Sequence, residues 1–199
     1  MTQTLAYPID DRLYLNITDR CTLRCAFCPK YNDSREVRGY DLTLDHRPEV
    51  DEITAAIGDP TAYREVVFCG YGEPTLRLKT LLAVAAWIKA RGGRVRINTD
   101  GLANRVHKRD VLPELAGLVD ALSVSLNAQD EATYIRHCRP TLPDSYAAVQ
   151  DFLARAPRHV PQVTATAIAG LEGVDIAACE RLASSLGVAF RRRELDRVG

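Results

Sequence analysis

The stretch Cys21-Thr-Leu-Arg-Cys25-Ala-Phe-Cys28 brings three thiols into eight residues, directly after an apolar run over residues 13–17 that is typical of a β-strand. A structural zinc site takes four ligands, and the sequence has no second Cys-x-x-Cys pair to supply the other half. In a [4Fe–4S] cluster each iron has a cysteine ligand, so three cysteines leave one iron open for a substrate or cofactor. Two plainer interpretations are a zinc site completed by His46 and thiols that only pack in a core.

Around this stretch, short β-rich runs alternate with helical patterns, which predicts an α/β fold with a parallel sheet. Strands are expected over residues 13–17, 65–69, 94–98, 121–125, 162–168 and 188–192. Helices are expected over residues 49–57, 78–88, 103–118 (interrupted by Pro113), 145–155 and 176–186. Six strands are fewer than the eight of a closed barrel, so we expect an incomplete (β/α)6-type TIM barrel, with a doubly wound sheet as the alternative. In both architectures, ligands bind at the carboxyl ends of the strands.

The composition is that of an ordinary globular protein. Of 199 residues, 46% are hydrophobic and 26% are charged, and the formal net charge is zero, so a large basic surface for nucleic acid is not indicated. The longest apolar run, residues 81–88, is far shorter than the roughly 20 residues that span a bilayer. Residues 1–11 lack the pattern of a secretory signal, and the six cysteines favour the reducing cytoplasm. We expect one domain over residues 1–199, with the cysteines in a loop over residues 18–46.

The spacing Cys21-x-x-x-Cys25-x-x-Cys28, with Phe27 before the last cysteine, resembles the signature of the radical S-adenosylmethionine (radical SAM) superfamily. The resemblance implies that Cys21, Cys25 and Cys28 bind a [4Fe–4S] cluster and that the amino and carboxylate groups of SAM chelate the open iron. It also implies an electron donor of the flavodoxin or ferredoxin type. Reductive cleavage of SAM then yields a 5′-deoxyadenosyl radical, which takes a hydrogen atom from the substrate.

Motifs after the second and third expected strands fit the same resemblance. Gly70-Tyr71-Gly72-Glu73-Pro74 resembles the glycine-rich turn that contacts the SAM amino group, although family members commonly have glycine at the position of Tyr71. Gly72 and Glu73 are the main candidates there, and a routine loop is the alternative. In Asn98-Thr99-Asp100-Gly101, Thr99 is the candidate, while Asp100 equally fits an Asx turn.

The fourth expected strand ends in a polar face. Alternation places Ser123, Ser125 and Asn127 on one side, and by resemblance Ser125 and Asn127 contact the SAM ribose and carboxylate. A polar layer that satisfies itself is the alternative. At the end of the fifth strand, Ile168 and Gly170 are candidates for the adenine edge, and Phe27 is a candidate apolar surface for adenine or a core residue.

The remaining cysteines and arginines allow weaker inferences. Arg136 and Arg139 are candidates for an anionic group of SAM or substrate. Cys69 and Cys179 are expected to be buried thiols, and Cys138 is expected to be structural, although neighbouring cations would favour a reactive thiol. The run 191–193 is three arginines, which is usually solvated surface, with polyanion binding as the alternative.

A closer likeness rests on Cys28-Pro29-Lys30 and the segment 37–42, which resemble the small radical SAM proteins associated with TatD-family nucleases. The likeness implies a functional link to a TatD-family hydrolase and no membrane partner. The loop over residues 31–46 is a candidate lid. Three alternatives stay open: an activase for a glycyl-radical enzyme, a radical SAM enzyme acting on a nucleobase or pterin, and a noncatalytic metal-binding or interaction module.

Overall fold

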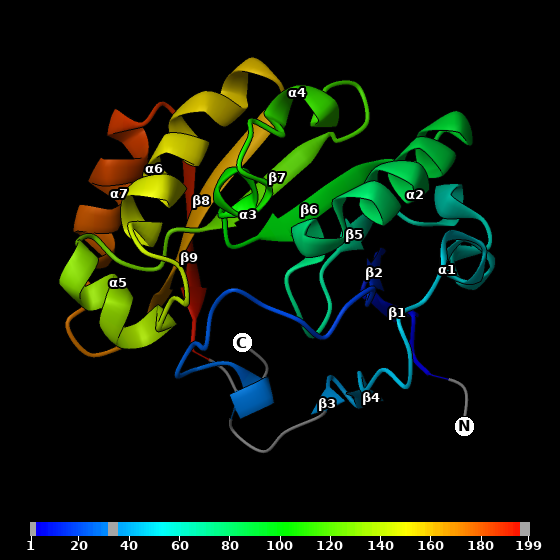
Figure 1. The fold of residues 1–199 in the computed structure, drawn as a ribbon, viewed down its shortest axis with the longest axis horizontal. Helices are drawn as coiled ribbons and strands as arrows, with labels where there is room; N and C mark the ends of the chain where they lie inside the picture. The colour runs from blue at the N-terminus through cyan, green and yellow to red at the C-terminus, as the bar shows by residue number, and fades with distance from the viewer. Residues whose placement is uncertain (1–2, 32–35, 196–199) are drawn as a thin grey trace.

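The computed structural model describes residues 3–31 and 36–195 of the chain (Figure 1). Within them the largest element is a seven-stranded sheet. Its strands are, from one edge to the other, β1 (Ala6–Ile9), β2 (Arg12–Leu15), β5 (Glu65–Phe68), β6 (Val95–Thr99), β7 (Ala121–Ser125), β8 (Gln162–Ala169) and β9 (Ala189–Glu194). All neighbours from β2 to β9 pair in parallel, which confirms the predicted α/β class and agrees with an incomplete barrel.

The sheet has one strand more than the sequence predicted. β1 pairs with β2 in antiparallel fashion through a turn at Asp10, whose φ is 52°. The proline at position 8 argues against a strand, but Pro8 lies at the edge of the sheet, where a missing N–H costs no ladder bond to a second neighbour. A separate two-stranded hairpin, β3 (Glu36–Val37) with β4 (Tyr40–Asp41), lies within the predicted loop, whose residues 32–35 fall outside the described residues.

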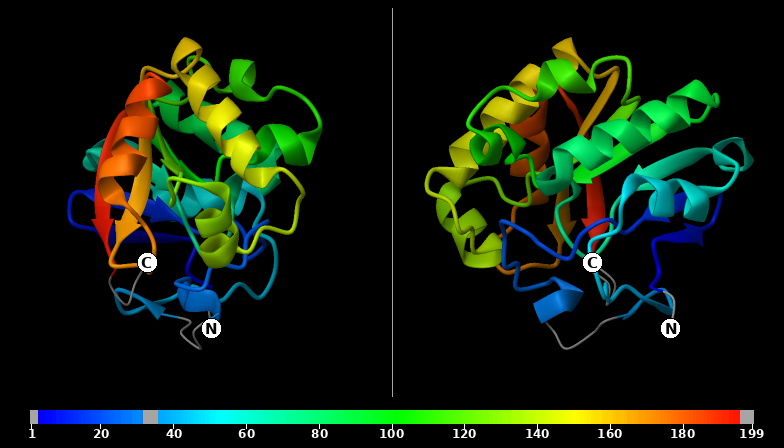
Figure 2. Two further views of the ribbon diagram at one scale, coloured as in Figure 1. Left: turned by 90° about the vertical axis from the view of Figure 1, so that its left-hand side faces the viewer. Right: turned by 45° about the vertical axis from the view of Figure 1, so that its right-hand side comes forward.

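Helices cover one face of the sheet (Figures 1 and 2). The α-helices are α1 (Val50–Ile57), α2 (Leu78–Ala90), α3 (Ala103–His107), α4 (Leu112–Leu115), α5 (Glu131–Cys138), α6 (Ser145–Arg155) and α7 (Ile176–Ser185). Short 3-10 turns lie at η1 (Pro29–Tyr31), η2 (Pro60–Ala62), η3 (Pro74–Arg77) and η4 (Ala156–Arg158). The helix predicted over residues 103–118 is two helices, because Lys108 adopts a left-handed conformation that ends α3. α5 was not predicted.

Alternation along each strand separates the core from the lumen of the partial barrel. On β5 to β8 every second residue is buried against the helices. These residues are Val66, Phe68, Val95, Ile97, Leu122, Val124, Val163 and Ala165. The residues between them face the opposite side of the sheet and are largely polar. The hydrophobic core therefore lies between sheet and helices, and the other face is left for chemistry. No helix in the described part of the chain is long and apolar enough to cross a membrane.

Candidate functional site: a cysteine-lined cavity

A cavity of about 480 Å³ opens at the carboxyl ends of the strands, and all three clustered cysteines line it. The loop after β2 supplies Cys21, Cys25 and Cys28, and each side chain is partly exposed. The structure also brings to this cavity the predicted residues Phe27, Gly70, Tyr71, Gly72, Glu73, Thr99, Ser125 and Asn127. Residues far apart in the chain meet here because the carboxyl ends of parallel strands share one edge of the sheet.

The cysteine segment is held from one side by the end of α5. The amides of Arg24 and Ala26 donate to the carbonyls of Cys138 and His137, at 3.0 and 2.8 Å. The last carbonyls of a helix have no partner within the helix, so they are available to a docking segment. The carbonyl of Thr22 accepts in turn from the amide of Thr141, at 3.0 Å. The backbone of the three-cysteine segment is thus fixed by the C-terminus of a helix that the sequence pattern did not reveal.

Two buried carboxylates hold the same segment from the other side. Thr22 Oγ1 donates to Asp100, and the amide of Asp100 donates to Glu73 Oε2 at 2.7 Å. Glu73 Oε1 also accepts from the amide and hydroxyl of Thr75, at 3.0 and 2.6 Å, and from Thr99 Oγ1, at 2.8 Å. These hydrogen bonds join the loops after β2, β5 and β6. They show that Glu73 and Thr99, predicted as SAM contacts, each make contacts that hold the loops together.

Burial controls the ionisation of these carboxylates. Loss of solvent and, to a smaller extent, the neighbouring charge of Asp100 raise the pKa of Glu73 to about 8, against the lowering effect of its hydrogen bonds. Burial also raises the pKa of Asp100. A raised pKa is what two acidic groups sharing a buried site should show, since a second negative charge there has no cation to balance it.

The glycines of the turn after β5 are required by close backbone packing. A Cβ on Gly72 would lie 2.7 Å from the carbonyl oxygen of Thr18, and one on Gly70 would lie 2.6 Å from the Cα of Asn16. The amide of Tyr71 donates to Asn16 Oδ1 at 3.1 Å, and Asn16 Nδ2 donates to the carbonyl of Leu42 at 2.9 Å. The turn is therefore pressed against the strand that leads into the cysteine segment. Asn16 was not singled out in the sequence.

The polar wall of the cavity carries acceptors without partners. The side-chain oxygens of Asn98 and Asn127 are buried and accept no hydrogen bond within the described residues. Ser125 and Thr166, neighbours across the β7–β8 ladder, line the same wall. An unpaired buried acceptor is costly, so this wall suits a ligand that donates several hydrogen bonds. The ammonium and ribose hydroxyls of SAM are such donors, and the residues present fit that cofactor.

The thiols suit an object larger than one metal ion. Within the parts of the chain that the structure describes, no three His, Cys, Asp or Glu side chains gather closely enough to hold a single ion. His46, the fourth zinc ligand of the alternative interpretation, lies 2.8 Å from Glu52 on the exposed surface and does not line the cysteine cavity, which argues against that interpretation. Burial raises the pKa of Cys21 to about 12, and a bound cationic centre would favour its thiolate. A [4Fe–4S] cluster, which spreads three ligands over three irons, fits this donor set.

Several predicted residues lie outside the cavity. Arg136 faces Glu172 at 3.9 Å on the surface, and Arg139 lines a shallow surface pocket beside Arg24. Ile168 and Pro74 are buried in the protein, and Gly170 is exposed with a φ of 88°. The winding of α5, which no sequence pattern signalled, turns the two arginines away from the cysteines.

Of the three other cysteines, Cys69 differs from expectation. Cys69, predicted to be a buried core thiol, lines the cavity instead, because it follows β5 on the inward-facing register. Cys179 is buried as predicted. Cys138 is buried, and its sulfur accepts from Asn127 Nδ2 at 3.4 Å and interacts with the thiol of Cys25. Cys138 thus lies directly behind the three-cysteine segment.

The cavity also contains residues that the sequence analysis did not select. Strand alternation brings Tyr14, Asn98 and Thr166 to its wall, together with Arg96, Arg191 and Arg193. The signal was present in the sequence for all of these residues except Arg193, since the others lie at inward positions of the expected strands and Arg193 directly follows the last one.

Comparison with known proteins agrees with this geometry. The family model described as Radical SAM superfamily matches residues 15–186. The chain is 27% identical to the GTP 3′,8-cyclase of Rhodopirellula baltica over 183 residues, which is 91% of this chain and 49% of the relative. It spans about half the length of the curated relative it matches.

Solved structures support the fold. SuiB of Streptococcus suis bound to its precursor peptide SuiA superposes with a TM-score of 0.70 at 14% identity, covering 94% of this chain and 39% of SuiB. SuiB bound to S-adenosylmethionine gives a TM-score of 0.66 at 12% identity, covering 92% of this chain and 40% of SuiB. At such low identity the likeness establishes the shared architecture.

Proposed function

Because this chain belongs to the Radical SAM superfamily, we propose that it is an enzyme that cleaves SAM reductively and abstracts a hydrogen atom from a substrate. Cys21, Cys25 and Cys28 would hold a [4Fe–4S] cluster, with SAM at the remaining iron. The observation that carries the proposal is the meeting of three thiols and two unpartnered amide oxygens, those of Asn98 and Asn127, in one cavity. When bound, cluster and SAM supply one-electron cleavage of a carbon–sulfur bond and a 5′-deoxyadenosyl radical.

The protein's own residues bind and orient in this scheme. Asn127 Oδ1 and Ser125 Oγ accept hydrogen bonds from the SAM ribose or ammonium, and Phe27 offers an apolar surface beside them. Glu73 acts as a positioning residue: it holds the loops after β5 and β6 together while Asp100 holds the cysteine segment. The helices behind the sheet exclude water from the rear of the site. An electron donor of the flavodoxin or ferredoxin type completes the proposal.

The experiment is anaerobic reconstitution with iron and sulfide, followed by SAM and dithionite or reduced flavodoxin. We expect a brown protein with four irons and four sulfides per chain, as the cluster formula requires, and 5′-deoxyadenosine as product. A His46→Ala variant should give the same yield, because His46 lies at the surface with Gln3 and Glu52. A fully loaded protein that binds SAM but forms no 5′-deoxyadenosine with either reductant contradicts the proposal.

The finer assignment, to the subgroup associated with TatD-family hydrolases, is supported by Cys28-Pro29-Lys30 and by the segment 37–42, in which Val37 and Arg38 border the cavity. A cluster held by thiolates needs a reducing compartment, which favours the cytoplasm. We test the functional link by incubating the reconstituted protein with cell metabolites, then adding a TatD-family hydrolase. A product that the hydrolase consumes supports the link, and a product that it leaves untouched contradicts it.

A further inference from the structure

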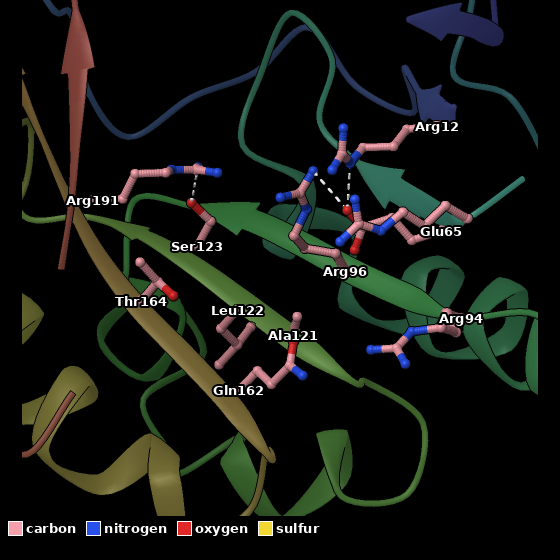
Figure 3. A pocket seen from close by; sticks show the side chains of 11 residues that line it. Arg12, Glu65, Arg94, Arg96, Ala121, Leu122, Ser123, Gln162, Thr164 and Arg191 are labelled. Atoms are coloured by element: carbon pink, nitrogen blue, oxygen red, sulfur yellow. Dashed lines mark hydrogen bonds and ion pairs between the residues drawn. The ribbon is translucent and has the colours of Figure 1, made fainter. Parts of the chain in front are cut away.

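A second cavity of about 460 Å³ lies at the opposite, amino end of the same lumen, and arginine dominates its lining (Figure 3). Five arginines and one carboxylate, that of Glu65, belong to the lining. The arginines are Arg12, Arg64, Arg94, Arg96 and Arg191. TIM-barrel lumens are normally packed with branched hydrophobic side chains, so a cationic lining is a departure that needs a cause. The whole chain carries no net charge, which makes the local excess of positive charge more telling.

The two cavities are joined by shared residues. Arg96, Ser123 and Arg191 line both of them, and Arg193 lines the cysteine-bearing one. The charges of Arg96 and Arg193 act on the thiol of Cys69 at the carboxyl end of β5, so these guanidinium groups lie close to the proposed cofactor site. A ligand held by the arginines therefore reaches the cysteine-lined end without leaving the lumen.

Two carboxylates serve the arginines near the amino end of the lumen. Asp11 pairs with Arg12 at 3.1 Å and with Arg64 at 3.7 Å. Glu65 pairs with Arg12 at 2.7 Å and with Arg96 at 3.2 Å, as Figure 3 shows. Arg191 donates to Ser123 Oγ at 3.0 Å, and within the described residues neither Arg191 nor Arg193 forms an ion pair. The Nε of Arg96 is buried without a hydrogen-bond partner.

Strand β9 separates its three arginines by alternation. Arg192 faces away from the lumen and pairs with Glu194 at 2.7 Å, as a solvated surface residue does. Arg191 and Arg193 face inward, on the register that places Arg191 beside Thr166 and Thr166 beside Ser125. The interpretation of this run as solvated surface fits Arg192, whereas Arg191 and Arg193 line the cavity although Arg191 is also exposed to solvent. Partial burial and the charges of Arg96 and Arg193 lower the pKa of Arg191.

We propose that Arg96, Arg191 and Arg193 bind the anionic part of the substrate, a small molecule with a multiply charged oxyanion group, either phosphate or clustered carboxylates. The inference rests on the proposed function, which it deepens by naming the substrate class. The planar guanidinium fork matches the oxygens of either group. Bound this way, the substrate has its charged end among the arginines and its hydrogen-bearing carbon toward the cysteine-lined end of the lumen.

The test is calorimetric titration of the full-length, reconstituted protein with pyrophosphate and, separately, with tricarballylate. Wild type and the control Arg192→Gln should bind one of these probes with equal affinity. The double variant R191Q/R193Q should bind it at least about a hundredfold more weakly, since it loses two guanidinium groups and each hydrogen bond to a charged group accounts for roughly tenfold or more in affinity. The affinity of R191K/R193K should lie between those of the wild type and R191Q/R193Q, because lysine keeps the positive charge but lacks the planar guanidinium group. The probe that binds identifies phosphate or carboxylate as the recognised group.

Two results overturn the inference: no binding of either probe to the wild type, or equal affinity in wild type and both double variants. If R191Q/R193Q does not fold, as judged by circular dichroism, the comparison with R191K/R193K decides in its place. SAM binding and 5′-deoxyadenosine formation by the wild type are measured in the same preparations. Absent SAM cleavage with intact, arginine-dependent anion binding refutes the proposed function alone, and the reverse pattern refutes the anion site alone.

Discussion

The carboxyl end of the lumen is held together by hydrogen bonds between loops, whereas its amino end is lined by like charges with few partners. At the first end, Thr22, Asp100 and Glu73 link three loops, and the end of α5 fixes the cysteine segment. At the second, Glu65 and Asp11 pair with Arg12, Arg64 and Arg96, whereas Arg191 donates only to a serine. The fixed geometry of the carboxyl end suits a cofactor that stays bound. The excess positive charge of the amino end suits an anion that binds and leaves, because the anion supplies the missing negative charge.

The largest expected effect comes from removing one thiol at the carboxyl end of the lumen, where hydrogen bonds hold the loops together. Cys25→Ala should reduce bound iron and 5′-deoxyadenosine formation to background, because a [4Fe–4S] cluster held by three cysteines loses a ligand that no other residue replaces. The control is Cys179→Ala, which removes a buried thiol on α7, away from the cavity. Iron and sulfide are measured after identical reconstitution. Full iron content in Cys25→Ala would show that the cysteines do not hold the cluster.

A smaller effect is expected from one unpartnered acceptor. Asn98→Ala should weaken SAM binding by about tenfold, which corresponds to the loss of roughly one hydrogen bond. Thr164→Ala, at the arginine-lined end, should change SAM affinity by less than about twofold, within the spread expected of a surface substitution. Equilibrium binding of SAM to the reconstituted variants measures both. Equal losses of SAM affinity in the two variants would contradict the proposed division of the lumen into a cofactor-binding end and an anion-binding end.

The hydrogen-bonded group of Thr22, Asp100 and Glu73 predicts that the stability of the fold depends on pH. Folded Glu73 keeps its proton up to a pKa of about 8, while the unfolded carboxyl loses it near 4.5. Between these values the folded state binds the extra proton, so the free energy of unfolding should fall as pH rises and level off above pH 8. Glu73→Gln should flatten this slope, whereas Glu180→Gln, at an exposed position of α7, should leave it unchanged. Urea unfolding of the metal-free protein from pH 5 to 9 measures it, and parallel slopes in all three proteins would contradict the assignment.

The smallest effect is expected at the surface end of α5. Arg136→Gln should change the free energy of unfolding by less than about 0.5 kcal/mol, because its contact with Glu172 is long and exposed. SAM affinity should stay at the wild-type value, since Arg136 lies outside the cavity. Thermal unfolding and SAM titration check the two statements. A clear loss of SAM affinity would restore the role that the sequence suggested for this arginine.

Much of the architecture could be predicted because periodicity is a local property. The strand over residues 121–125 and the helix over residues 145–155 coincide with β7 and α6. α5 escaped because it is only eight residues long and its buried face, with Tyr134 and Cys138, has little apolar periodicity. β1 escaped because Pro8 is tolerated only at a sheet edge, and edge position is a property of the assembled sheet.

The site divides in the same way. The three cysteines, Ser125 and Asn127 were identified because spacing and alternation are written in the chain. The hydrogen-bonded group of Thr22, Asp100 and Glu73 could not be identified in this way, because it joins loop residues that are 27 to 78 positions apart in the sequence. The arginine lining was found only in part: the run 191–193 was noticed as a group, whereas Arg12 and Arg64 lie just outside the expected strands and meet the others only in the assembled sheet.

Within the described residues the sheet runs from β1 to β9, and these two strands do not pair with each other, so the sheet does not close into a barrel there. We expect a substrate to enter across this unpaired side, past β9. Arg191 on β9 is exposed and lines the arginine-lined cavity, so it would contact a substrate that enters by that route. Entry and selection by charge would then take place at the same point of the molecule, before the substrate reaches the cysteine-lined end of the lumen.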